Sequence, residues 1–275
     1  MKKIDVKTAL DFHEGMRLDK FLTELLPESG LRQRRRLIEN GFVLVNGRPR
    51  KTGFKIFSGA EVALLKEDTR SCAAEIASRL AVIAQTDAYA AVFKPDLIHS
   101  ARVAGSPEPT AEECLNDLLH NSKAILVNRL DMLTSGLLLV AFGAERETMF
   151  REYEDAGQVE KFYLARVHGA PERNFTVKNR LDTADRKRTK VLDEEDEPLR
   201  WTRAEILNVD GDGTAVLGVR ISKGARHQIR AHLAHAGYPI VGDPLYGADG
   251  ESGRMYLHHR RIAFPGFEAE CDPEW

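Results

Sequence analysis

The sequence predicts an α+β fold, with a large carboxy-terminal part built on a largely antiparallel sheet and a small α/β domain before it. From residue 81 onward, apolar strand-like segments follow one another without the regular strand–helix alternation of a parallel α/β fold. Two of them, residues 201–207 and 215–221, are joined by the turn sequence Asp210-Gly211-Asp212-Gly213. Helical periodicity followed directly by a hairpin sequence occurs within the first 66 residues.

Composition indicates a water-soluble globular protein of one or two domains. The chain has 275 residues, of which 43% are hydrophobic and 30% charged. Its three cysteines are scattered, which argues against a disulfide framework or a thiolate zinc site and fits a reducing cytosol. No segment is long and apolar enough to span a bilayer, and the first residues lack the apolar core of a signal peptide. We therefore expect a cytoplasmic protein without membrane association.

The net charge of −2 conceals an asymmetry along the chain. Residues 1–66 hold 14 Lys and Arg against 8 Asp and Glu, a net charge of +6, whereas the remainder holds 26 against 34, a net charge of −8. Because local basic patches set the affinity for phosphates, the amino-terminal part can bind nucleic acid despite the acidic total.

Two helices are predicted at the start of the chain. The first, residues 17–26, ends at Pro27, and the second runs from about Leu31 to the Asn40-Gly41 cap. The apolar residues of the first helix fall on one face: Leu18, Phe21, Leu22, Leu25 and Leu26.

A hairpin and a further strand complete this domain. Residues 42–48 form an apolar strand that runs into the Asn46-Gly47 turn, and residues 61–65 form the closing strand. Arginines are concentrated on the second helix and the hairpin: Arg32, Arg34, Arg35, Arg36 and Arg48. Arginine suits bidentate phosphate contacts, although an isolated arginine run is more often a solvated helix face. The helix–hairpin order resembles the S-four-like RNA-binding domain, which favours RNA contact through backbone and shape rather than base stacking.

The polar stretch that follows predicts the domain boundaries: residues 1–66 form the first domain, residues 67–80 a linker, and residues 81–275 the second domain. Elements expected in the second domain, besides the two strands above, are strands at 90–95, 137–142 and 161–167 and helices at 111–119, 144–155 and 226–236. Residues 124–127 lead into the loop that carries Asp131.

The candidate for chemistry is Asp131, in the sequence Asn128-Arg129-Leu130-Asp131-Met132-Leu133-Thr134-Ser135-Gly136. This carboxylate lies beside a cation and immediately before a buried strand, a position suited to a nucleophile or a base. A turn aspartate that bonds its own backbone is the alternative, and it would be preferred if this segment stood alone.

Two further segments change that judgement: Lys161-Phe162-Tyr163-Leu164-Ala165-Arg166-Val167-His168-Gly169, and the stretch from Ser222 to Gly247 that contains Arg226-His227-Gln228-Ile229-Arg230. The three motifs, in this order, resemble those of the RluA-type RNA pseudouridine synthases, and the resemblance covers roughly residues 80–275. It implies a mixed sheet with a central RNA-binding cleft.

The resemblance also implies roles for individual residues. Asp131 is the essential carboxylate, Arg230 its ion-pair partner, and Tyr163 the ring that packs on the base. Whether Asp131 forms a covalent adduct or acts as a base stays open.

Other residues are implied contacts to RNA: Arg129, Arg226 and His227. The run His258-His259-Arg260-Arg261 is a further candidate for RNA contact. His227, His232 and His235 lack a carboxylate at metalloprotease spacing, so we predict no metal site there.

The chain departs from the family pattern at two positions. Asn128 stands where histidine is usual, and an amide cannot titrate near neutrality. Ala225 stands where arginine is usual, so the first arginine of that motif is displaced by one residue, about 100° if this segment is helical. These changes leave Asp131, Tyr163 and Arg230 in place.

We therefore expect an RNA isomerase that converts specific uridines of ribosomal RNA, or else transfer RNA, to pseudouridine. The reaction involves no redox or phosphoryl-transfer step, so we expect no metal and no nucleotide cofactor, and we expect a monomer. The alternative is a catalytically inactive RNA-binding protein of the same fold that acts in ribosome assembly. An aspartate phosphotransferase is excluded because position 133 is Leu, and a glycosidase would need a second facing carboxylate.

Overall fold

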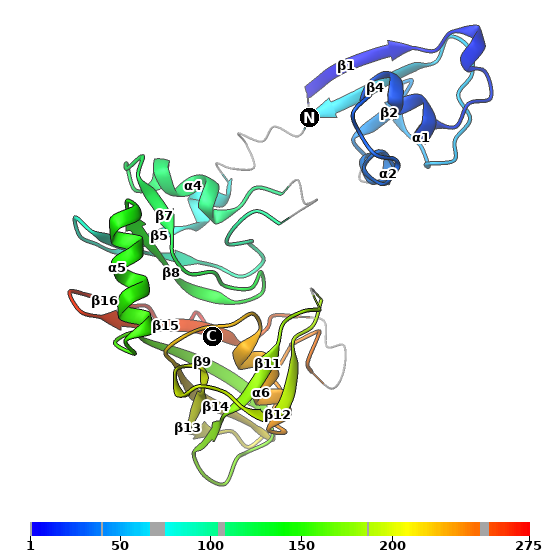
Figure 1. Ribbon diagram of the computed structural model, residues 1–275. Coiled ribbons are helices and arrows are strands. Elements are labelled where there is room, and N and C mark those ends of the chain that lie inside the picture. Colours follow the sequence, from blue (N-terminus) through cyan, green and yellow to red (C-terminus); the bar gives the residue numbers. More distant parts are fainter. Residues whose placement is uncertain (1, 40, 67–74, 104–107, 186, 248–252) are drawn as a thin grey trace. The chain divides into compact units, whose positions relative to one another are not determined.

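The computed structural model describes the chain except for residues 1, 40, 67–74, 104–107, 186 and 248–252 (Figure 1). The chain divides into two compact units, the first within Met1–Glu75 and the second comprising Ile76–Val103 and Glu108–Trp275. Most of the expected linker, residues 67–74, lies outside the described residues. None of the helices in the described part combines the length and the apolar content that a bilayer crossing requires.

The amino-terminal unit is a four-stranded antiparallel sheet with strand order β1-β4-β2-β3 and two short helices. The elements are β1 Lys2–Thr8, α1 Leu18–Phe21, α2 Leu31–Glu39, β2 Val43–Val45, β3 Arg48–Pro49 and β4 Glu61–Lys66. Asn46 and Gly47, with φ of 48° and 73°, form the β2–β3 turn, as the Asn-Gly sequence predicts. Strand β1 was not predicted, and it pairs with β4.

The first predicted helix is shorter than its periodicity suggested. Only Leu18–Phe21 is α-helical, and Leu22–Glu24 continues as a 3₁₀ turn, η2. Its apolar face is nevertheless the centre of the core, because Leu18, Phe21 and Leu22 are fully buried together with Ile38 of α2. Packing of this face, rather than helix length, therefore determines the fold of the unit.

The second unit is built on a ten-stranded mixed sheet. Its strands, in chain order, are β5 Ala81–Gln85, β6 Tyr89–Lys94, β7 Ala124–Leu126, β8 Ser135–Phe142, β9 Glu160–His168, β10 Phe175–Val177, β13 Thr202–Val209, β14 Thr214–Ile221, β15 Leu257–Phe264 and β16 Phe267–Glu270. The main path is β10-β13-β14-β9-β15-β8-β6-β5, with β7 paired to β8 and β16 to β15. Only β15 and β8 pair in parallel among the described strands, so the predicted, largely antiparallel α+β architecture is confirmed.

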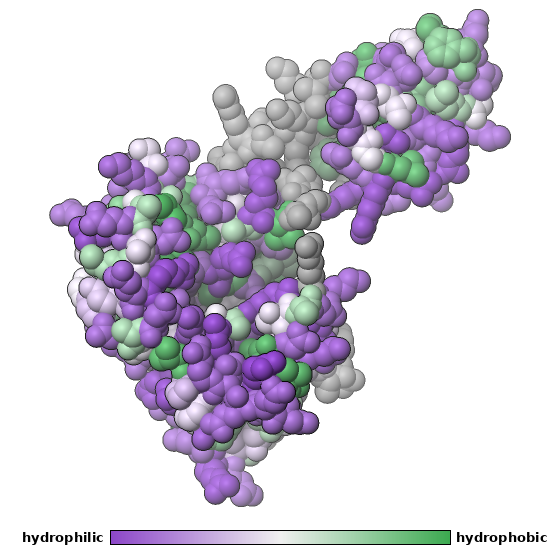
Figure 2. Space-filling model, in the orientation of Figure 1, coloured by the Kyte–Doolittle hydropathy of each residue, from purple (hydrophilic) through white to green (hydrophobic). Residues whose placement is uncertain are grey.

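Helices and a separate hairpin flank this sheet (Figure 1). They are α4 Ala111–Leu118, the β11–β12 hairpin with strands Asn179–Asp182 and Lys190–Glu195, α5 Ala144–Asp155, the 3₁₀ turn η3 Pro198–Arg200, and α6 Gln228–His235. Phe150 of α5 packs in one core cluster with Leu137, Leu139 and Phe264. The visible face of both units is mostly hydrophilic, with apolar residues scattered across it (Figure 2).

Candidate active site

Asp131 lies on the loop between β7 and β8, and the side chain of Asn128 fixes the start of that loop. Its Oδ1 accepts a 2.6 Å hydrogen bond from the Leu139 amide, and its Nδ2 donates to the Leu137 carbonyl at 3.3 Å. The amide thus continues the β7–β8 pairing with side-chain atoms beyond the last backbone bond, which the Val127 amide donates to the Leu139 carbonyl at 2.8 Å. This is a structural role that does not require a titrating group, and it accounts for an asparagine at this position.

Further contacts hold the loop on both sides of Asp131. The Ser100 hydroxyl accepts from the Leu130 amide at 2.9 Å and donates to the Leu130 carbonyl at 2.7 Å. After Asp131, the Thr134 amide donates back to the Asp131 carbonyl at 3.0 Å. The carboxylate is therefore presented from a rigid turn, with its side chain 27% exposed.

Lys94, at the end of β6, is fully buried and contacts this loop. Its amino group donates to the carbonyls of Pro95 at 2.8 Å, Ile98 at 2.9 Å and Met132 at 3.4 Å. Burial lowers the pKa of Lys94 to about 7, although the negative charges of nearby carboxylates, including Asp131, raise it in part. Lys94 thus anchors the segment that follows the carboxylate.

Arg230 of α6 reaches Asp131 across 99 residues of sequence. Its Nη1 lies 2.6 Å from Asp131 Oδ2, while Nε and Nη2 each donate to the buried carboxylate of Asp243 at 2.8 Å. Burial lowers the pKa of the Arg230 guanidinium, but the bonds and charges of Asp243 and Asp131 outweigh burial and raise it. The arginine is therefore a permanent cation aimed at Asp131.

Tyr163 of β9 is buried and lies close enough to Asp131 to feel its charge. In the sheet register Tyr163 pairs with His259, which pairs with Gly136, which pairs with Lys94, and paired residues point to the same face. The Tyr163 ring stacks on His259 at a centroid distance of 4.4 Å. Burial, and then the charge of Asp131, raises the pKa of Tyr163, so its phenol stays protonated.

His232 of α6 and the two histidines of β15 are structural. His258 and His259 are fully buried, so the prediction that they contact RNA is wrong. His232 is also fully buried, with Nδ1 2.8 Å from the Thr202 hydroxyl and Nε2 2.9 Å from the Asn179 carbonyl. Within the described residues, no three His, Cys, Asp or Glu side chains gather in a group that could hold a metal ion.

Arg226 does not lie on the helix predicted for residues 226–236, because α6 begins at Gln228. The 100° rotation expected from the Ala225 change therefore does not apply. The Arg226 guanidinium instead donates to the carbonyls of Thr183 and Asp185 in the β11–β12 hairpin. His227 is half-buried with φ of 55°, and its Nε2 lies 3.8 Å from Asp131 Oδ2.

The arginines predicted to bind RNA in the amino-terminal unit divide into two groups. Arg34 donates to the Asp19 carbonyl at 2.9 Å, and Arg35 to the Asp19 carboxylate at 2.8 Å. Hydrogen bonding from Arg17, aided by Arg35, lowers the pKa of the buried Asp19 to about 2. Arg35 is exposed despite this contact, as are Arg32, Arg36 and Arg48, and Arg129 on the Asp131 loop.

Sequence reasoning assigned no role to two residues of this site, Asp243 and Tyr246. Asp243 holds Arg230, and Tyr246 lies 5.3 Å below its guanidinium. The available signal was the Gly242-Asp243-Pro244-Leu245-Tyr246-Gly247 segment, in which a carboxylate and a phenol follow a glycine of positive φ.

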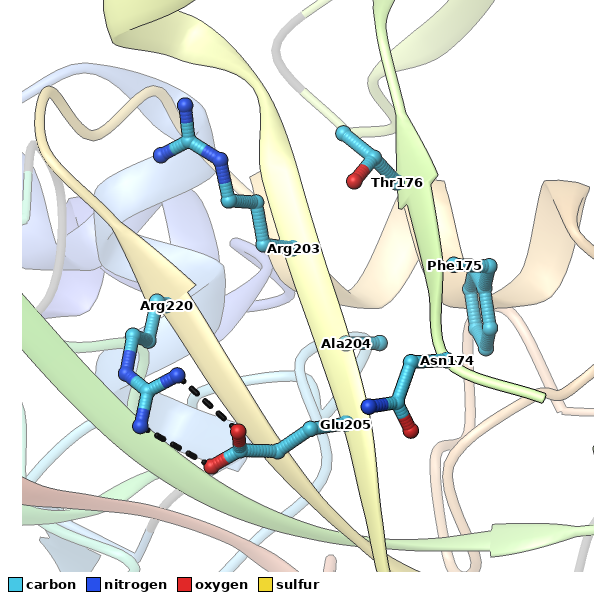
Figure 3. Close-up of a pocket in the computed structure, with 7 residues that line it drawn as sticks. All are labelled: Asn174, Phe175, Thr176, Arg203, Ala204, Glu205 and Arg220. Atoms are coloured by element: carbon cyan, nitrogen blue, oxygen red, sulfur yellow. Dashed lines mark hydrogen bonds and ion pairs between the residues drawn. The ribbon is translucent and has the colours of Figure 1, made fainter.

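Neither of two depressions of the surface is lined by Asp131. One, of about 300 Å³, is at the β10–β13–β14 edge (Figure 3). Its Arg220 and Glu205 form a bidentate ion pair at 2.9 and 3.0 Å. The other, of about 310 Å³, lies between the β11–β12 hairpin and the start of α6 and includes Arg180 and Gln228. We place the chemistry at Asp131 because the ion pair, the buried phenol and the rigid loop converge there.

Comparison with known proteins agrees with this geometry. Residues 88–235 match the family described as RNA pseudouridylate synthase, and residues 16–62 match the S4 domain. An uncharacterised RNA pseudouridine synthase of Chloroflexus aurantiacus is 34% identical over 256 residues, covering 89% of this chain and 78% of the relative. Ribosomal large subunit pseudouridine synthase D of Xylella fastidiosa is 33% identical over 254 residues, covering 87% and 74%.

Solved structures show the same fold at lower identity. Human RNA pseudouridylate synthase domain containing 4 superposes with a TM-score of 0.61 at 18% identity, covering 75% of this chain and 93% of that one. Human RNA pseudouridylate synthase domain containing 1 gives a TM-score of 0.58 at 23% identity, covering 72% and 84%.

Proposed function

Since the chain belongs to the RNA pseudouridylate synthase family and carries an amino-terminal S4 domain, we propose that it isomerises specific uridines of large-subunit ribosomal RNA to pseudouridine. The observation that carries the proposal is the 2.6 Å contact between Arg230 Nη1 and Asp131 Oδ2. The choice of RNA is supported by relatives named ribosomal large subunit pseudouridine synthase D.

The reaction balances without an external reactant. The N1–C1′ bond of uridine breaks, the uracil rotates, and a C5–C1′ bond forms. The C5 proton leaves to solvent and N1 gains a proton. Asp131 supplies the carboxylate that acts at the sugar or the base, and Arg230 keeps it ionised and oriented. The Tyr163 ring, which stacks on the His259 ring, provides the surface on which the extruded base packs.

RNA affinity comes from separate cations in this proposal. Arg32, Arg36 and Arg48 of the S4 domain are exposed, and we assign them to phosphate contacts. Arg129 is exposed next to the catalytic loop, and we assign it to the RNA around the target uridine. We further propose an RNA-binding domain at residues 1–66 and a catalytic domain at 81–275, acting as a cytoplasmic monomer. Sedimentation of the pure protein tests the monomer.

Mapping of pseudouridine in total RNA tests the function. Strains with the protein, without it, and with Asp131→Asn are compared at every uridine of ribosomal and transfer RNA. We expect a site in large-subunit RNA that is modified only when the intact protein is present, while Asp131→Asn still binds the RNA. No difference at any position would favour the inactive RNA-binding alternative.

A further inference from the structure

The phenol of Tyr246 connects the β11–β12 hairpin to the active site. Tyr246 is 8% exposed. Its hydroxyl accepts a 2.8 Å hydrogen bond from the Thr189 amide, which lies next to β12. The same oxygen lies 3.1 Å from the Thr189 carbonyl and 3.1 Å from Nδ1 of His227. One hydroxyl group therefore contacts both the hairpin and the residue that precedes α6.

Tyr246 is itself fixed to the Arg230–Asp243 pair. Its backbone amide donates to Asp243 Oδ1 at 3.0 Å, and the Arg230 guanidinium lies 5.3 Å from its ring centroid. On the hairpin side, the Arg188 guanidinium lies 5.1 Å from the same ring. The phenol thus has a defined position relative to the cation that contacts Asp131.

His227 adopts a conformation that must be held by its surroundings. Its φ of 55° is in the left-handed region, which costs a non-glycine residue about 1 kcal/mol. This conformation points the ring toward Asp131, with Nε2 3.8 Å from Oδ2, while Nδ1 faces Tyr246. The two ring nitrogens therefore connect the phenol to the catalytic carboxylate.

The proton on the phenol decides the tautomer of this imidazole. If the hydroxyl donated to the Thr189 carbonyl, His227 would carry its proton on Nδ1, and the lone pair of Nε2 would face the Asp131 carboxylate. If the hydroxyl donates to Nδ1, the proton of His227 lies on Nε2 and faces Asp131. The second arrangement replaces a repulsion between two acceptors by an attraction.

We propose that Tyr246 is a positioning residue that holds His227 with its proton on Nε2, directed at Asp131, so that the carboxylate is oriented by two donors, Arg230 and His227. This inference rests on the proposed function. When RNA excludes water from the site, His227 Nε2 moves from its present 3.8 Å to hydrogen-bonding distance of Asp131 Oδ2. The bound uridine then contacts an Asp131 carboxylate that is held by Arg230 and His227.

The charge state of His227 follows from the groups that face it. Two carboxylates, Asp131 and Asp243, oppose two guanidiniums, Arg226 and Arg230, and the phenol of Tyr246 is neutral. Burial lowers the pKa of His227, so the ring is neutral at pH 7. On acidification the imidazolium pairs directly with Asp131 and draws the carboxylate away from the bound uridine, which gives an acid limb to kcat.

The test compares Tyr246→Phe, His227→Gln and the double variant with the intact protein. Steady-state release of tritium from C5 of the mapped uridine measures kcat and KM. We expect each single variant to lower kcat about tenfold with little change in KM, and the double variant to be no slower than either single one. His227→Gln should abolish the acid limb. Tyr246→Phe should move the limb to higher pH, because loss of the donor to Nδ1 favours protonation.

Tyr89→Phe is the matched control, since it also removes a buried hydroxyl that donates a 2.9 Å hydrogen bond, to the Arg146 carbonyl, away from the site. Three outcomes would overturn the inference: an unchanged acid limb in Tyr246→Phe, multiplying effects in the double variant, or an equal loss of kcat in Tyr89→Phe.

If Tyr246→Phe does not fold, ¹⁵N shifts of His227 in the intact protein decide instead. A proton on Nε2 supports the proposal, and a proton on Nδ1 contradicts it. An intact protein that releases no tritium contradicts the proposed function, and the ¹⁵N measurement still tests the tautomer.

Discussion

Asp243 holds Arg230 by two parallel 2.8 Å hydrogen bonds, and this pairing leaves Nη1 of the arginine for Asp131. Both side chains are almost completely buried, 6% exposed for Arg230 and 0% for Asp243. Because an arginine carries five N–H donors in a rigid plane, fixing two of its nitrogens fixes the direction of the third. The orientation of the Asp131 carboxylate therefore depends on a second, fully buried carboxylate, that of Asp243.

Asp243→Asn should disturb both stability and turnover. It leaves Arg230 with a single carboxylate partner in a buried site, and loss of one member of a buried pair costs about 3–5 kcal/mol. We expect the free energy of unfolding to fall by about 3 kcal/mol and kcat to fall on the order of 100-fold, from misplacement of Asp131. Denaturant unfolding and tritium release measure the two effects.

Glu205→Gln is the control for that variant. Glu205 and Arg220 also form a bidentate pair, at 2.9 and 3.0 Å, but their side chains are 29% and 44% exposed. An exposed pair contributes about 0–1 kcal/mol, so neither stability nor turnover should change appreciably. Equal effects of the two substitutions would show that Asp243 has no special role.

Gly136→Ala should prevent close pairing of β8 with β15. Gly136 has φ of 114°, and a Cβ at this position would overlap the backbone of His259. Since neither backbone can move without breaking the sheet next to the Asp131 loop, we expect a loss of at least about 3 kcal/mol in unfolding free energy. Gly211→Ala, where a Cβ meets no atom within 4 Å, should stay within about 0.5 kcal/mol. Similar melting temperatures for the two variants would contradict this account.

Segments with strong periodicity were predicted well from the sequence. The helix expected at residues 144–155 is α5 Ala144–Asp155, and the strand expected at 161–167 is β9 Glu160–His168. In both, local pattern and final environment agree. Strand β15, Leu257–Phe264, was missed because its centre is His258-His259-Arg260-Arg261, a polar run without strand periodicity. Its position between β9 and β8 buries the two histidines. Pairing with these neighbouring strands therefore makes the segment a strand although its own residues do not favour one.

The site was predictable in part. The proximity of Asp131 and Arg230 was expected from the family resemblance, since no local pattern relates residues 99 positions apart. The functions of Asp243 and Tyr246 could not be read from sequence, because they depend on which side chain each one meets in the folded protein. The same holds for Arg34 and Arg35, because their contacts to Asp19 depend on where that residue lies in the fold, and nothing in the arginine run sets them apart from Arg32 and Arg36.

Acidification should destabilise the protein through His232. Burial lowers the pKa of His232 from 6.5 to about 4. The unfolded chain therefore binds more protons between these values, and the contribution of His232 to stability is present above pH 6.5 and is lost as the pH falls toward 4. The loss amounts to about 3 kcal/mol at pH 4. Unfolding free energies of the intact protein and His232→Gln between pH 4 and 8 measure it, and parallel curves for the two would contradict the assignment.

The arginines of α2 should separate into binding and structural residues. Arg32 and Arg36 are exposed, so the double variant Arg32→Ala/Arg36→Ala should weaken RNA binding and reduce the salt slope by about 2, one for each lost phosphate contact. Its unfolding should be unchanged. Arg34→Ala removes the 2.9 Å bond to the Asp19 carbonyl that ties α2 to α1, so it should lower stability by about 1 kcal/mol with a smaller change in the salt slope. RNA affinity measured as a function of salt, together with thermal unfolding, distinguishes the two. A salt slope that falls only in Arg34→Ala would reverse the assignment and make Arg34 the phosphate ligand.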